Sequence, residues 1–171
     1  MSQPNSTHTP QLVTRDGAVI PDGWTLLADD DTTGADGPFI LSFERALREL
    51  DGRNGHYGVR VLPADDVRLL EPFLEKITLI EVAFPGYRDG RGYSTARILR
   101  EDFGYTGIVR AVGDVLRDQL FYMLRCGFDE FVVKDKDPSQ AITSAAQRFQ
   151  TVYQGAADSN RPAWAKRHTL A

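Results

Sequence analysis

The sequence alternates short apolar runs with longer stretches of helical periodicity, and this alternation constrains the fold more than any other feature. The runs are rich in β-branched and aromatic residues and are bounded by turn residues, as is typical of strands. They are YGVRVLP (57–63), ITLIEVAF (77–84), GIVRAV (107–112) and DEFVVK (129–134). Because consecutive strand–helix units with short links favour parallel strands, the pattern predicts an α/β fold with a mainly parallel sheet. The units are too few for a complete eight-fold barrel, so we expect a half-barrel-like sheet or an open, doubly wound one.

Helical stretches follow these strands. They cover 64–76, 93–103, 114–126 and 137–153. Pro72 lies inside the first of them and should split or kink it, because proline lacks the backbone N–H that a helix interior uses. The third has an apolar stripe made of Leu116, Leu120, Met123 and Leu124. An earlier helix is expected to begin near Pro38, with apolar residues at helical spacing at Ile40, Phe43, Leu47 and Leu50.

The two ends of the chain differ from this pattern. Asp16 and Gly17 lie between two short β-prone runs, which is typical of a hairpin because glycine accepts the positive φ of such turns. The first ten residues and residues 155–171 are polar or small, with little periodicity, and we expect both to be tails. The remaining residues, 11–154, are then one α/β domain with a small N-terminal β-hairpin.

Composition excludes several classes of function. With 24 acidic and 20 basic residues the net charge is −4, which argues against nucleic-acid or membrane binding through bulk charge. Cys126 is the only cysteine, and the three histidines are scattered, so we expect no disulfide, no metal, no catalytic triad and no cofactor. The start of the chain is neither basic nor apolar, and no run approaches a membrane span, which favours the cytoplasm.

The loop after the second strand is the most unusual part of the chain. The stretch GYRDGRGYSTARILR (86–100) contains four arginines and one aspartate. In parallel α/β folds the loops that leave the carboxyl ends of strands share one rim, where ligands bind. Glycines before a helix expose backbone N–H groups that attract anions, and Arg88 or Arg91 could add a bidentate contact. We therefore expect a ligand or a partner to bind at this loop.

A purely structural explanation of the same loop is also open. In that alternative Asp89 caps the turn, the glycines permit it, and the arginines that follow are solvated. Tyr93, Arg97 and Arg100 share one helical face, which would then face solvent.

Arg110 lies inside the strand 107–112, where alternation places it on one face of the sheet beside a helix. A buried guanidinium is costly unless it is paired. We expect an internal ion pair with Asp114, Asp89 or Glu81.

The third predicted helix also has a mixed stripe on the side opposite its apolar stripe. It consists of Asp114, Asp118, Phe121 and Arg125. The mixture of charge with a phenylalanine suggests a contact surface, unless Phe121 tucks under a neighbouring loop.

Three segments carry a family resemblance: FPGYRDGRGYSTARILREDFGYTG (84–107), RAVGDVLRDQLFYMLRCGFDEF (110–131) and RFQTVYQ (148–154). From Val59 to Gln154 the chain resembles a bacterial family, domain-of-unknown-function family 934. Its members are often described as oxidoreductases involved in sulfite reduction and tend to be encoded beside assimilatory sulfite reductase. Ile108 departs from the family pattern, in which we would expect a glutamate. The residues that match the motif are Asp89, Gly90, Arg91, Gly92, Tyr93, Ser94, Ala96, Arg110, Gly113, Asp114, Asp118 and Gln119.

The resemblance implies an accessory protein of assimilatory sulfite reduction that binds a sulfite reductase component or a small oxyanion at the rim. An alternative is a small α/β enzyme for a phosphorylated or sulfur-oxyanion metabolite, with Arg91 holding the anion and Asp89 or Asp114 as acid or base. A third is a homo-oligomer that pairs through sheet edges or through Phe121. The candidate binding residues are Asp89, Gly90, Arg91, Gly92, Tyr93, Ser94, Arg97, Arg110, Asp114, Asp118 and Gln119.

Overall fold

The computed structural model describes residues 9–31, 37–148 and 156–157. Within them one sheet contains eight strands in the order β2-β1-β8-β7-β6-β5-β4-β3. Neighbouring strands from β3 to β8 are parallel, whereas β1 pairs antiparallel with both β2 and β8. The strands are β1 (Gln11–Thr14), β2 (Val19–Ile20), β3 (Thr25–Leu26), β4 (Phe39–Ser42), β5 (Tyr57–Val61), β6 (Ile77–Phe84), β7 (Ile108–Gly113) and β8 (Glu130–Val133). The predicted α/β class and mainly parallel sheet are confirmed.

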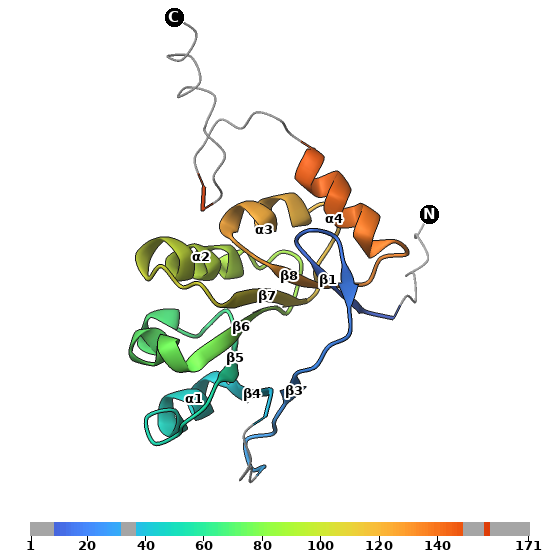
Figure 1. The fold of residues 1–171 in the computed structure, drawn as a ribbon. Coiled ribbons are helices and arrows are strands. Elements are labelled where there is room, and N and C mark those ends of the chain that lie inside the picture. The colour runs from blue at the N-terminus through green and yellow to red at the C-terminus, as the bar shows by residue number, and fades with distance from the viewer. Residues whose placement is uncertain (1–8, 32–36, 149–155, 158–171) are drawn as a thin grey trace, which may run out of the picture.

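The sheet is a half-barrel with its helices on one side, which excludes the doubly wound alternative. Helices α1, α2 and α3 all lie on the same side of strands β4 to β8, and the segment between β2 and β3 passes on the other side (Figure 1). A doubly wound sheet would have helices on both faces. The helices are α1 (Phe43–Glu49), η1 (Val67–Lys76), α2 (Arg91–Arg97), η2 (Ile98–Asp102), α3 (Leu120–Cys126) and α4 (Pro138–Gln147).

The core fills the space between the sheet and the helices. Phe84 of β6 and Phe131 of β8 are fully buried in it, together with Leu99 of η2 and Ile142 of α4. Gly92 lets α2 approach the sheet, since a Cβ built there would lie 2.6 Å from the Phe84 ring and 2.9 Å from Val82 Cγ1. The opposite face of the sheet has a different composition, described below.

Two helices begin later than their sequence patterns predict. The segment after Pro38 is strand β4, and α1 begins only at Phe43, after Ser42 accepts a hydrogen bond from Arg45 N. The helix predicted over 114–126 begins at Leu120. Leu116 therefore leaves the apolar stripe, and 38% of it is exposed.

Proline and glycine act as expected elsewhere. The stretch around Pro72 is a 3₁₀ helix, η1, in place of a regular α-helix. The predicted hairpin is confirmed, with Gly17 at a φ of +91° between β1 and β2. Helix α4 begins at Pro138 with Asp137 as its N-cap, and the predicted continuation beyond residue 148 lies outside the described residues, as do most of the predicted tails. Among the described residues no helix has the length and apolar character needed to cross a membrane.

Candidate functional site

A row of alternating charges crosses the face of the sheet that the helices leave open. Strand register places Arg60, Glu81, Arg110 and Glu130 side by side on β5, β6, β7 and β8. Arg60 Nε donates to Glu81 at 2.8 Å, Arg110 Nη1 contacts Glu81 at 3.3 Å, and Arg110 Nε donates to Glu130 at 2.8 Å. We call these four residues the charged row.

Arg110 is the centre of the charged row. Its residue is 1% exposed, and its guanidinium also donates to Asp22, on the segment between β2 and β3, at 3.0 Å. Burial disfavours the charged form, but Glu130, Asp22 and Glu81 together raise the pKa of Arg110. The arginine therefore stays charged, and it cross-links three strands and the crossing segment.

The expected ion pair of Arg110 is confirmed for Glu81, while Asp89 and Asp114 are not its partners. The expectation that Arg110 lies beside a helix is wrong, because its neighbours Val109 and Ala111 face the helical core. Our sequence reasoning missed Arg60, Glu130 and Asp22. Arg60 and Glu130 could have been noticed, because each is a charged residue within an apolar strand. Which charged residues pair with one another, however, follows only from the strand register.

The loop after β6 is held from within by two residues that follow β7. The carboxylate of Asp114 accepts a hydrogen bond from Tyr87 N at 3.0 Å, and Gln119 Nε2 donates to Tyr87 O at 2.8 Å. Gln119 Oε1 also accepts from Leu116 N at 3.2 Å, which brings Leu116 next to the loop. Gly113 permits this connection, because it has a φ of +99° and a Cβ there would lie 2.3 Å from Phe84 O.

The loop presents an aromatic ring and two arginines to solvent. Tyr87 is 49% exposed, and the guanidinium carbon of Arg88 lies 5.3 Å from its ring centroid. Arg88 makes no ion pair with any residue that the structure describes, whereas Arg91 Nη2 pairs with Asp89 at 2.7 Å. The hydrogen bond from Arg91 lowers the pKa of Asp89. We define Tyr87, Arg88, Arg91 and Leu116 as the rim surface.

Helix α2 carries the next three candidates. Tyr93 packs edge-on against Phe84, with ring centroids 5.5 Å apart, and burial raises the pKa of its phenol to about 12. The phenol therefore stays protonated at neutral pH. Ser94 is exposed, and Arg97 pairs with Glu101 at 2.8 Å on the surface of the helix.

The structure decides two alternatives that the sequence leaves open for the helices. Arg100 is not solvated, because its guanidinium donates to the backbone oxygens of Gly127 (2.9 Å), Gly107 (2.8 Å) and Tyr105, and to Asp129. Phe121 is 7% exposed, so it is tucked into the core and offers no contact surface. That removes the helical contact on which the homo-oligomer alternative relied, although the sheet edges stay open to it.

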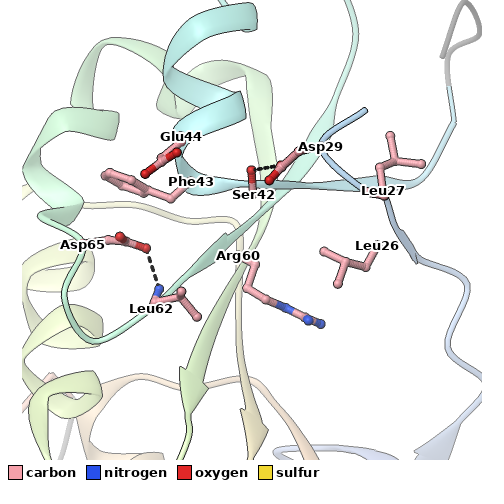
Figure 2. A pocket seen from close by; sticks show the side chains of 10 residues that line it. Leu26, Leu27, Asp29, Ser42, Phe43, Glu44, Arg60, Leu62 and Asp65 are labelled. Carbon is pink, nitrogen blue, oxygen red and sulfur yellow. Dashed lines mark hydrogen bonds between the residues drawn. The ribbon is translucent and has the colours of Figure 1, made fainter. Parts of the chain in front are cut away.

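A pocket of about 430 Å³ lies at the other end of the same rim. It is formed where β3, β4 and β5 end, with Leu26 and Leu27 on one side and Phe43, Glu44 and Asp65 on the other (Figure 2). Ser42 donates to Asp29 in its wall, Asp65 accepts from Leu62 N at 2.7 Å, and Arg60 connects the pocket to the charged row. This pocket was not predicted, because its polar residues are spread over three separate segments of the chain.

The structure therefore divides the predicted site. It brings Asp89, Gly90, Arg91, Asp114 and Gln119 together around one loop. It places Arg110 on the opposite face of the sheet and ties Arg97 to its own helix. Asp118 is exposed and lines a second cavity with Arg117 and α4. In the part of the chain that the structure describes, no group of three or more His, Cys, Asp or Glu side chains could hold a metal ion.

Together the fold and the rim define an α/β half-barrel protein with a charged row on its open face and polar loops at the carboxyl ends of its strands. Residues 58–164 match the family described as a bacterial protein of unknown function (DUF934), and the chain belongs to this family. A comparison with curated proteins gave no significant match.

Proposed function

We propose that this chain is a cytoplasmic accessory protein of assimilatory sulfite reduction that binds a partner enzyme through the rim surface. The sulfite context comes from the family resemblance on the DGRGYS and GDVLRDQ motifs. The mode of action, binding in place of catalysis, comes from the geometry of the loop that carries the first of these motifs.

One observation carries the proposal: the loop is anchored from beneath while its tip is exposed. Asp114 and Gln119 hold both backbone groups of Tyr87, and the Tyr87 ring remains half-exposed beneath Arg88. Tyrosine and arginine are enriched among the residues that contribute most to protein interfaces. A loop that is already ordered loses little conformational entropy on binding, which favours affinity.

Charge favours an acidic face on the partner. Arg88 lacks a carboxylate partner within the described residues, so an acidic group of the partner could pair with it directly. A small oxyanion would have to compete with Asp89 for Arg91, and neither of the two cavities described above includes a residue of this loop. A protein surface can contact the ring of Tyr87, Arg88 and Leu116 at once, so a partner protein fits this surface better than a small anion does.

The catalytic alternative receives less support from the same residues. Asp89 accepts from Arg91 N at 3.2 Å, and Asp114 accepts from Tyr87 N. Both carboxylates are used to shape the loop, and the Arg91 pair keeps the pKa of Asp89 low, which makes it a poor proton donor at neutral pH.

A complementation experiment tests the proposal. In a strain that lacks the gene, the wild-type chain should restore growth on sulfate, while growth on cysteine should need no complementation. Arg88→Glu should fail on sulfate, because it places a negative charge on the rim surface. Arg68→Glu is the matched control, since Arg68 has a similarly exposed side chain on η1, outside the rim surface. Normal growth of the deletion strain on sulfate, or full rescue by Arg88→Glu, would overturn the proposal.

A further inference from the structure

The pocket at the ends of β3, β4 and β5 has the dimensions of a small-molecule site. Its volume of about 430 Å³ falls within the range of roughly 300–1,000 Å³ that is usual for ligand pockets. It lies at the carboxyl ends of parallel strands, which is where half-barrels and barrels place ligands. The pocket is separate from the rim surface and shares no residue with it.

The mouth of the pocket is apolar. Leu26 is 44% exposed and Leu62 is 51% exposed, and both line the pocket. Water contact with these two side chains costs free energy that an apolar part of a ligand would recover. Phe43, which is buried, extends the apolar wall inward.

The polar groups of the pocket determine the charge of its ligand. Three carboxylates, Asp29, Glu44 and Asp65, line the pocket together with one guanidinium, Arg60. The charge of Arg60 is already matched by Glu81, whose oxygen lies 2.7 Å from Arg60 Nη2. The carboxylates therefore dominate the potential of the pocket, and an anion would be repelled from it.

Two of these carboxylates are held in place before any ligand arrives. Asp29 accepts the hydroxyl hydrogen bond of Ser42, and Asp65 accepts from Leu62 N. Glu44 makes no ion pair with any residue that the structure describes, so its full charge is available to a ligand. Fixed acceptors lose less entropy on binding than mobile ones.

From the volume, the apolar mouth and the charge, we propose that this pocket binds a small organic cation, an amine with an apolar body. The ammonium group contacts the carboxylates of Asp29 and Glu44, and the apolar body lies against Leu26 and Leu62. This site goes beyond the proposed function, because it takes a ligand of the opposite charge to a sulfur oxyanion and lies at the other end of the rim.

Phenethylamine is a suitable probe, with hydrocinnamate as an anionic analogue of similar shape and 2-phenylethanol as a neutral one. Isothermal titration calorimetry at low ionic strength should give saturable binding of phenethylamine, weaker binding of 2-phenylethanol and none of hydrocinnamate. Equal binding of all three, or no saturable binding of the amine, would overturn the inference.

A pair of double variants separates the pocket from bulk charge. Asp29→Asn combined with Glu44→Gln should weaken phenethylamine binding about tenfold, since two charge-assisted contacts are lost. Glu71→Gln combined with Glu75→Gln changes the net charge equally, at exposed positions on η1 outside the pocket, and should leave binding unchanged. Equal weakening in both double variants would reduce the effect to bulk charge and contradict a specific site. None of these outcomes depends on the rim surface or on sulfite reduction.

Discussion

The carboxylate of Asp114, one residue beyond β7, accepts a hydrogen bond of 3.0 Å from the backbone N–H of Tyr87 in the loop after β6. The contact joins two loops that are 27 residues apart in the chain. It orders the rim surface without using any of the side chains that the surface presents.

Removing this contact should loosen the loop and leave the fold intact. In Asp114→Ala the Tyr87 amide loses its acceptor, and a lost hydrogen bond of this kind costs about 1 kcal/mol. Hydrogen–deuterium exchange of residues 86–90 should become several-fold faster, while exchange in β6 and β7 stays unchanged. Asp118→Ala, an exposed carboxylate that makes no such contact with the loop, should leave exchange as in the wild type. Unchanged exchange in Asp114→Ala would show that the loop is held by other means.

The charged row should stabilise the folded protein because each of its charged side chains pairs with an oppositely charged neighbour. Glu81→Gln removes the carboxylate between Arg60 and Arg110 and leaves a buried guanidinium with an incomplete set of partners. Loss of one partner of a buried ion pair typically costs about 3–5 kcal/mol, and chemical denaturation should show a loss of this order. The matched control is Glu101→Gln, which breaks the exposed pair with Arg97 and should cost less than about 1 kcal/mol. Similar losses in the two variants would mean that burial of the row adds nothing.

Gly92 should not tolerate a side chain. In Gly92→Ala the new methyl group would meet the Phe84 ring, and overpacking of this kind usually costs about 1–3 kcal/mol. Gly86→Ala in the same region meets no atom within 4 Å and should change the free energy of unfolding by less than about 1 kcal/mol. A Gly92→Ala protein as stable as the wild type would place α2 farther from β6 than the structure does.

Tyr93 gives a pH dependence at the alkaline end. Burial raises the pKa of its phenol from 10.0 to about 12, so between these pH values the unfolded chain loses a proton that the folded chain keeps. The unfolded state therefore gains relative stability as the pH rises through this window. When the pH is raised from 10 to 12, the denaturation midpoint of the wild type should decrease, and that of Tyr93→Phe should decrease less. A parallel decline in both proteins would contradict a raised pKa at Tyr93.

The order of strands and helices could be predicted because it depends on local patterns. Apolar runs such as ITLIEVAF (77–84) identify buried strands, and the Asp16–Gly17 turn identifies the hairpin. The choice between a half-barrel and a doubly wound sheet was open, because periodicity does not show on which side a crossover helix packs. The antiparallel pairing of β1 with β8 was not predicted either, because it joins two strands that are far apart in the chain.

The roles of individual polar residues were harder to predict, since they depend on contacts between distant segments. Arg100 has the spacing of a surface residue, but its guanidinium donates hydrogen bonds to the carbonyls of Gly107 and Gly127. The stripe expected from Asp114 to Arg125 does not form, because the helix begins only at Leu120. The side chain of Gln119, just before the helix, instead donates to Tyr87 O. Arg110 was recognised as paired, but its partners Glu130 and Asp22 required the strand register and the path of the segment between β2 and β3.

Biolayer interferometry between the purified chain and purified assimilatory sulfite reductase measures the proposed interaction itself. The wild type should bind saturably, Arg88→Glu should bind about tenfold or more weakly, and Arg68→Glu should bind as the wild type does. Absence of binding by the wild type, or equal binding by Arg88→Glu, would contradict the claim that the rim surface is where this protein acts.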